Sequence, residues 1–168
     1  MPVTRLNHAV LYVRDVATSV AFYRDVLEFR VVNEMSGAAF MQAPASTNDH
    51  DLGLFQIGAQ AGASEAGRGT VGMYHLAWEV DTLDELARIS DALTKAGALV
   101  GASDHSSTKS LYGHDPDGLE FEIAWVVPAA MLNDETLAGR TKILPLDLPR
   151  EIARFGGDMR GGVGVSTA

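Results

Sequence analysis

The chain has 168 residues, of which 46% are hydrophobic and 21% are charged, as in an ordinary globular domain with a sizeable core. Its formal net charge of -9, from 13 basic and 22 acidic side chains, argues against binding to nucleic acid or to anionic membrane surfaces. The absence of cysteine excludes disulfides, thiolate metal sites and a cysteine nucleophile.

The N-terminus has no apolar signal core, and no run approaches the roughly 18 apolar residues of a membrane span. We therefore expect a cytoplasmic protein with no contact to a membrane.

The first half of the chain predicts a strand, a helix and three further strands. Residues 5–13 (R-L-N-H-A-V-L-Y-V) predict a strand, with Leu6, His8, Val10 and Tyr12 on one face. Asp15 stands where a helix N-cap belongs, and apolar residues at helical spacing predict a helix over 16–27. Strand-like runs follow at 29–35, 38–42 and 51–57.

The second half repeats this pattern after a Gly/Ala-rich connection over 58–72. A strand is predicted over 73–80, and Asp81 or Thr82 then caps a helix that ends at Gly97. Three more strands are predicted over 98–103, 109–113 and 119–126.

The two halves also resemble each other in sequence. N-H-A-V-L-Y-V-R-D-V opens the first and Y-H-L-A-W-E-V-D-T-L opens the second. Each has a histidine on its first strand, His8 or His75, followed by an acidic helix cap. We therefore predict an α+β fold in which one β-α-β-β-β module is used twice, at about 5–57 and 73–126. One domain then covers 1–126.

Residues 127–168 form an extension of irregular composition. Short helices are predicted over 129–138 and 149–155, and we expect the final ten residues to be frayed.

The stretch from Ser103 to Trp125 ends in a strand with carboxylates at alternate positions. Glu120 and Glu122 face one side of this strand, and its apolar residues face the other. A carboxylate pair on so apolar a strand needs water, a counter-charge or a metal ion.

Three residues occupy equivalent places on the strands: His8, His75 and Glu122. A lone histidine on a strand is more often a core or surface residue than a ligand. Two histidines and one carboxylate together make a facial ligand set for a divalent metal. Fe(II) is the leading candidate for such a set when three positions must stay open for substrate and oxygen. Mn(II), Zn(II) or Ni(II) could occupy a similar shell.

The Ser103–Glu122 segment resembles a motif of the vicinal oxygen chelate (glyoxalase/bleomycin resistance/dioxygenase) superfamily. Within it, the chain resembles the type I extradiol, catechol 2,3-dioxygenase-like enzymes over about residues 5–126. Ser103 departs from the pattern, because the family prefers other residues there. The matching positions are His105, Leu111, Tyr112, Asp115, Pro116, Gly118 and Glu122.

This resemblance implies that curled mixed sheets surround a concave metal site held by His8, His75 and Glu122. His105 would be the acid–base residue, whose alternative is a solvated loop histidine. Tyr112 would donate a hydrogen bond to a substrate oxygen, and its alternative is a packing aromatic. Glu120 would lie at the rim or beside a ligand. His50 and His114 are predicted to be surface residues.

The implied activity is Fe(II)-dependent, extradiol ring cleavage of a small aromatic diol by O2, in aromatic catabolism and in a homodimer or other homo-oligomer. One departure is that many family members are twice as long. A glyoxalase I-like isomerase or thiol-transfer enzyme is an alternative, with Gln56 as a fourth metal ligand. A non-catalytic, bleomycin-resistance-type binding protein is another.

Overall fold

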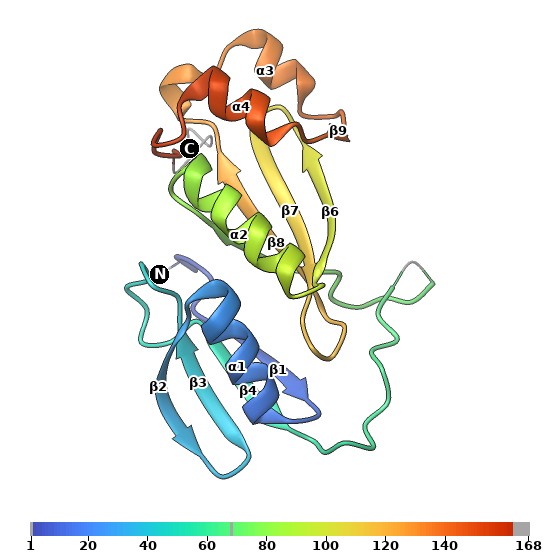
Figure 1. The fold of residues 1–168 in the computed structure, drawn as a ribbon. Helices are drawn as coiled ribbons and strands as arrows, with labels where there is room; N and C mark the ends of the chain where they lie inside the picture. Colours follow the sequence, from blue (N-terminus) through green and yellow to red (C-terminus); the bar gives the residue numbers. More distant parts are fainter. Residues whose placement is uncertain (1, 68, 163–168) are drawn as a thin grey trace. The chain divides into compact units, whose positions relative to one another are not determined.

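The computed structural model describes residues 2–67 and 69–162, and the chain divides into two compact units (Figure 1). The first unit comprises Met1–Glu65 with Asp115–Leu119, and the second comprises Ala66–His114 with Glu120–Ala168. Both contain the element order β-α-β-β-β. The structure thus confirms the predicted repeat and the α+β class.

The first unit is a four-stranded mixed sheet with one helix. Its strands are ordered β1-β4-β3-β2, with β1 and β4 parallel and the other pairs antiparallel. The helix follows the prediction, and Asp15 caps it by accepting the Thr18 N–H at 2.7 Å. The first strand is shorter than predicted, so His8 immediately precedes it. The elements are β1 (Ala9–Val13), α1 (Val16–Leu27), β2 (Arg30–Met35), β3 (Ala38–Gln42) and β4 (Leu52–Gln56).

The second unit repeats this topology in the order β5-β8-β7-β6, again with the first pair parallel. Thr82, and not Asp81, is the helix cap, and it accepts the Glu85 N–H at 3.2 Å. The strand after the linker is shorter than predicted, so His75 also immediately precedes its strand. The elements are β5 (Leu76–Glu79), α2 (Leu83–Lys95), β6 (Leu99–Asp104), β7 (Thr108–His114) and β8 (Glu120–Val126).

The extension is more ordered than its composition predicts. It contains η1 (Ala129–Met131), α3 (Asp134–Gly139), β9 (Leu144–Pro145) and α4 (Leu148–Phe155). The strand β9, which the sequence did not indicate, pairs with β6 as a fifth strand of the second sheet. The helix α4 lies beside α2 (Figure 1), and Phe155 packs on Trp125 with 5.4 Å between ring centroids. The expected fraying of the final ten residues falls partly on 163–168, outside the described residues.

The two faces of the second sheet differ sharply in character. One face packs against α2 through strand residues that are at most 2% exposed, and each such side chain contributes about 1.5–3 kcal/mol on burial. These residues are Leu111, Phe121, Ile123 and Trp125. The opposite face carries the polar residues of β7 and β8, together with His75. We call it the site face; it includes His75, Ser110, Tyr112, Glu120 and Glu122.

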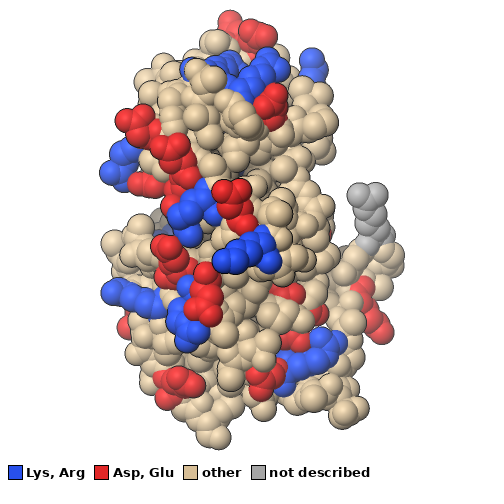
Figure 2. Space-filling view, in the orientation of Figure 1, with Lys and Arg blue, Asp and Glu red and all other residues tan. Residues whose placement is uncertain are grey.

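Basic and acidic side chains are intermixed on the surface. In the view of Figure 2, basic and acidic groups stand beside one another, and pairs such as Arg24–Asp25 and Arg88–Glu85 form ion pairs. Within the part of the chain that the structure describes, no helix has the length and apolarity needed to cross a membrane.

Candidate metal and substrate site

His75 and Glu122 meet on the site face of the second unit. The parallel register pairs Ala77 with Glu122, which brings the histidine just before β5 next to this carboxylate. The His75 Nε2 atom lies 3.0 Å from Glu122 Oε2. The other carboxylate oxygen, Oε1, accepts a 2.5 Å hydrogen bond from the Ser110 hydroxyl. Ser110 therefore fixes the carboxylate while one of its oxygens faces the imidazole.

His105 and Tyr112 form a second pair on the same face. His105 lies in the β6–β7 turn, and its Nε2 atom is 2.9 Å from the Tyr112 hydroxyl. Tyr112 is the register partner of Glu122, and its ring centroid is 5.9 Å from that of His75. Burial, and then the charge of Glu122, raises the pKa of Tyr112. The phenol therefore keeps its proton at neutral pH and is available as a donor.

Glu120 is the second carboxylate of the site face. Its Oε1 atom lies 3.9 Å from His75 Nδ1, and its Oε2 atom lies 3.6 Å from His114 Nε2. His75 Nδ1 is buried and has no hydrogen-bond partner among the described residues. Glu120 is thus a near neighbour of a predicted ligand, as its position on the strand indicated. His114 is 45% exposed.

His8 lies in the first unit, where it is exposed and its Nδ1 atom is 2.7 Å from Asn7 Oδ1. Its ring centroid is 4.5 Å from that of His50. The His50 side chain is only 18% exposed, and its ring also meets Phe40 edge-on at 5.0 Å. His50 is therefore partly buried, between a surface and a core position.

No spacing signal in the sequence could have found His50. It stands between Asp49 and Asp51, which is typical of a solvated loop. Only the pairing of β4 with β1, continued by the 2.9 Å hydrogen bond from the Ala9 N–H to the Asp51 carbonyl, brings it against His8.

Gln56 does not occupy the position that corresponds to Glu122. Glu122 pairs with the residue two places after His75; in the first unit, the residue two places after His8 is Val10, which pairs with Gly53. Gly53 thus takes the equivalent place and offers no side chain. Gln56 Oε1 instead accepts the Val16 N–H at 3.1 Å, at the start of α1.

The chemistry of the site face fits a cation. Its strand residues include Glu79, Glu120 and Glu122 but no lysine or arginine, as the alternation along β5–β8 shows. Carboxylates on one face without a lysine or arginine partner favour a bound divalent ion, which neutral histidines can help to ligate. Among the described residues, no group of three or more histidine and acidic side chains is assembled that could hold a metal by itself. The three-ligand site of His8, His75 and Glu122 therefore stays a prediction.

The Asp115–Gly118 turn, part of the motif noted in the sequence, has a structural role. Asp115 Oδ1 accepts the N–H groups of Asp117 and Leu119, each at 2.9 Å, and Gly118 adopts a φ of +81°. Within the first unit, Asp117 also pairs with Arg14 at 2.7 Å, and the Tyr23 hydroxyl donates to Asp115 Oδ2 at 3.3 Å.

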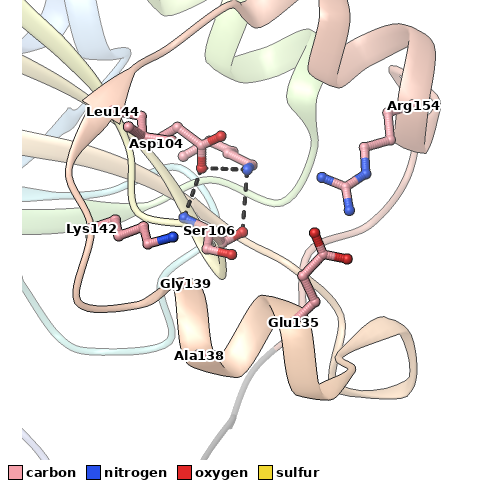
Figure 3. Close-up of a pocket in the computed structure, with 9 residues that line it drawn as sticks. Asp104, Ser106, Glu135, Ala138, Gly139, Lys142, Leu144 and Arg154 are labelled. Carbon is pink, nitrogen blue, oxygen red and sulfur yellow. Dashed lines mark hydrogen bonds and ion pairs between the residues drawn. The ribbon is translucent and has the colours of Figure 1, made fainter.

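A pocket of about 270 Å³ lies where the extension meets the β6–β7 turn (Figure 3). Asp104 and Lys109, which line it, belong to the face of the sheet opposite Tyr112 and Glu122. The pocket is lined by Asp104, Ser106, Lys109, Glu135, Ala138, Gly139, Lys142, Leu144 and Arg154.

Residues 5–123 match the profile of the glyoxalase/bleomycin resistance protein/dioxygenase superfamily. The chain belongs to this superfamily. The match covers both repeats and every residue of the site face that the resemblance singled out.

Two curated relatives of this superfamily member are named as catechol-cleaving enzymes. Metapyrocatechase 2 of Cupriavidus necator is 30% identical over 98 residues, covering 58% of this chain and 27% of the relative. Catechol-2,3-dioxygenase of Bacillus subtilis (strain 168) is 27% identical over 120 residues, covering 71% and 41%. The matched regions span less than half the length of either relative.

Solved structures share the fold but carry several different names. A glyoxylase/bleomycin resistance protein/dioxygenase domain from Frankia sp. EAN1pec has a TM-score of 0.63 at 20% identity, covering 74% of this chain and 93% of that one. A lactoylglutathione lyase from Agrobacterium tumefaciens has a TM-score of 0.55 at 22% identity, covering 74% and 95%. A mutant of the fosfomycin resistance protein FosX from Listeria monocytogenes, complexed with Mn(II) and a dihydroxypropylphosphonic acid, has a TM-score of 0.55 at 17% identity, covering 73% and 90%. These likenesses establish the fold alone.

Proposed function

We propose that this superfamily member is a metal-dependent, extradiol ring-cleaving dioxygenase that acts on a catechol-type substrate with O2. The observation that carries the proposal is the arrangement on the site face of the second unit. There, the His75–Glu122 pair and the His105–Tyr112 pair lie within one patch, with 5.9 Å between the rings of His75 and Tyr112. A ligand pair next to an acid–base pair suits oxidation of a diol that must lose protons. The two curated catechol dioxygenases support the same reading.

In this proposal His75 and Glu122 are metal ligands, and His8, predicted from the sequence, is the third. Fe(II) is the proposed ion, with Mn(II), Zn(II) or Ni(II) as alternatives. When bound, such an ion lowers the cost of deprotonating the substrate hydroxyls and provides positions for dioxygen. The orphaned His75 Nδ1 atom and the carboxylates without lysine or arginine partners support a cation here.

Other residues of the chain hold and move protons. His105 Nε2 accepts or donates a proton at the substrate oxygen, a role that suits an imidazole placed beside the Tyr112 hydroxyl. Tyr112 donates its hydroxyl hydrogen to a substrate oxygen, because its raised pKa keeps it protonated. Ser110 keeps Glu122 in place through its 2.5 Å hydrogen bond. We further propose one domain over 1–126 and assembly as a homodimer or other homo-oligomer.

A glyoxalase I-like isomerase is the alternative that the fold permits, and a lactoylglutathione lyase is among the solved relatives. It would require a fourth ligand from the first repeat. The register weighs against this, because Gly53 stands at the place that corresponds to Glu122, and the Gln56 amide oxygen is already hydrogen-bonded to α1.

Anaerobic purification, metal analysis and oxygen uptake with a panel of catechols test the proposal. Bound iron with catechol-dependent oxygen consumption is expected, whereas bound zinc or nickel without oxygen uptake would overturn it. Two variants sharpen the test. His75→Ala should lose the metal, whereas His105→Ala should retain the metal and lose turnover. His114→Ala is the matched control, since its imidazole is more exposed and pairs with Glu120, which is not a proposed ligand.

A further inference from the structure

Two consecutive residues of the extension contact the short turn that carries His105. Gly139, at the end of α3, packs so closely on Ser106 that an added Cβ would lie 2.5 Å from Ser106 Oγ and 2.7 Å from Ser106 Cβ. The next residue, Arg140, donates from Nε to Ser107 Oγ at 3.2 Å. Just before the turn, β9 pairs with the end of β6. The turn is therefore enclosed by the extension on both of its flanks.

The same turn is strained and is held by buried charge. Ser106 adopts a φ of +67°, in the left-handed region that strains a residue with a Cβ. The Asp104 carboxylate accepts the Ser106 N–H at 2.7 Å, and Lys109 Nζ donates to the Ser106 carbonyl at 3.2 Å (Figure 3). Lys109 is fully buried and also pairs with Glu151 of α4 at 3.0 Å. The extension thus supplies part of the charge that holds the strained residue.

The side chains of His105 and of the residues next to it lie on opposite sides of this turn. The imidazole reaches the Tyr112 hydroxyl at 2.9 Å on the site face. Ser106 meets Gly139 of α3, and Asp104 and Lys109 line the pocket on the extension side. Because the turn has only three residues between β6 and β7, a shift of Ser106 moves His105 with it.

We propose that the C-terminal extension is a positioning element for the catalytic imidazole, and that Gly139 and Arg140 set the place of His105 through Ser106 and Ser107. The expected effect on turnover rests on the proposed function, whereas the expected effect on the position of His105 does not. A displacement of about 1 Å at a reacting group lowers turnover by up to roughly 100-fold. Gly139 and Arg140 are then positioning residues and not catalytic ones.

The test replaces Gly139 by alanine. Because Ser106 Cβ is attached directly to the backbone, the turn and α3 must move apart to admit the new methyl group, and we expect the turn to move. Long-range ¹H–¹⁵N spectra of the full chain, recorded without added metal, measure the chemical shifts of the imidazole nitrogens. We expect the His105 Nε2 resonance to shift and the His75 resonances to stay in place. Gly62→Ala is the matched control, since an added Cβ there meets nothing within 4 Å.

Kinetics on the metal-loaded protein then measure the consequence. Gly139→Ala should lower kcat by roughly tenfold or more, with KM and metal content unchanged within about twofold. Arg140→Met, which removes only the bond to Ser107, should shift the same resonance in a chain that keeps the α3 packing. A folded Gly139→Ala protein with an unchanged His105 resonance would overturn the proposal. A shifted resonance in a protein that consumes no oxygen with any catechol would sustain it and refute the proposed function instead.

Discussion

Lys109 offers the most quantitative test of how the extension is joined to the second sheet. Its side chain is completely buried, with Nζ at 2.5 Å from Asp104 Oδ1, 3.0 Å from Glu151 Oε2 and 3.2 Å from the Ser106 carbonyl. Methionine has a similar length and keeps the packing but removes the charge. Lys109→Met therefore takes the buried cation away from both carboxylates and leaves Glu151, which is only 4% exposed, with Arg154 at 3.7 Å as its remaining cation.

Removal of one partner from a buried ion pair costs about 3–5 kcal/mol, because the remaining charge stays desolvated. Asp104 is 20% exposed, so water relieves part of its charge, and we expect a loss of about 3 kcal/mol in the free energy of unfolding. Lys95→Met, at an exposed position in the last turn of α2, is the control and should change the free energy by less than about 0.5 kcal/mol.

Urea unfolding followed by tryptophan fluorescence measures this loss where it occurs, since both tryptophans, Trp78 and Trp125, belong to the second unit. Glu151→Gln should restore part of the stability of Lys109→Met, because it removes one of the two carboxylate charges that lose Lys109. A Lys109→Met protein within about 1 kcal/mol of the wild type would refute the reasoning, and so would additive effects of the two substitutions.

Three further outcomes follow from the structure. Tyr112→Phe keeps the ring but loses the hydroxyl that meets His105, so kcat should fall roughly 10- to 100-fold with unchanged metal content; an unchanged kcat would leave Tyr112 as a packing residue. Asp115→Asn tests the pKa of a carboxyl that burial raises. In the wild type, the raised pKa of Asp115 in the folded state adds stability below the unfolded-state pKa of about 3.9, and this stability is lost as the pH rises through the folded-state pKa. The stability of Asp115→Asn relative to wild type should therefore increase from about pH 4 upward. Denaturant titrations at several pH values measure this, and a flat difference would contradict it. Gly97→Ala places a Cβ in open space but at a φ of +67°, so thermal unfolding should show a loss of about 1 kcal/mol from the backbone alone, against almost none for Gly62→Ala.

Parts of the candidate site could be predicted from the sequence because they depend on strand alternation. Glu120 and Glu122 share a face of β8, and Tyr112 reaches the same face because it pairs with Glu122. His50 could not be predicted in the same way. Its place beside His8 depends on the pairing of β4 with β1, and its immediate neighbours are all typical of a surface loop.

Local structure follows from short-range patterns in this chain. The helix over 16–27 and its Asp15 cap were predicted residue by residue, because capping bonds and helical periodicity act within a few positions of the chain. The repeated element order also followed from the sequence, since each module has its own alternation and its own helix cap.

The pairing of strand residues and the packing of the extension depend on long-range contacts. Register between strands distant in sequence is set by the packing of a whole face, so the sequence could not separate Gly53 from Gln56 as the counterpart of Glu122. Lys109 is likewise a charged residue in an alternating strand, and its burial depends on Glu151 of a helix about 40 residues later in the chain. Contacts of this kind have no local signature, because the groups that make them are polar and solvated until the fold brings them together.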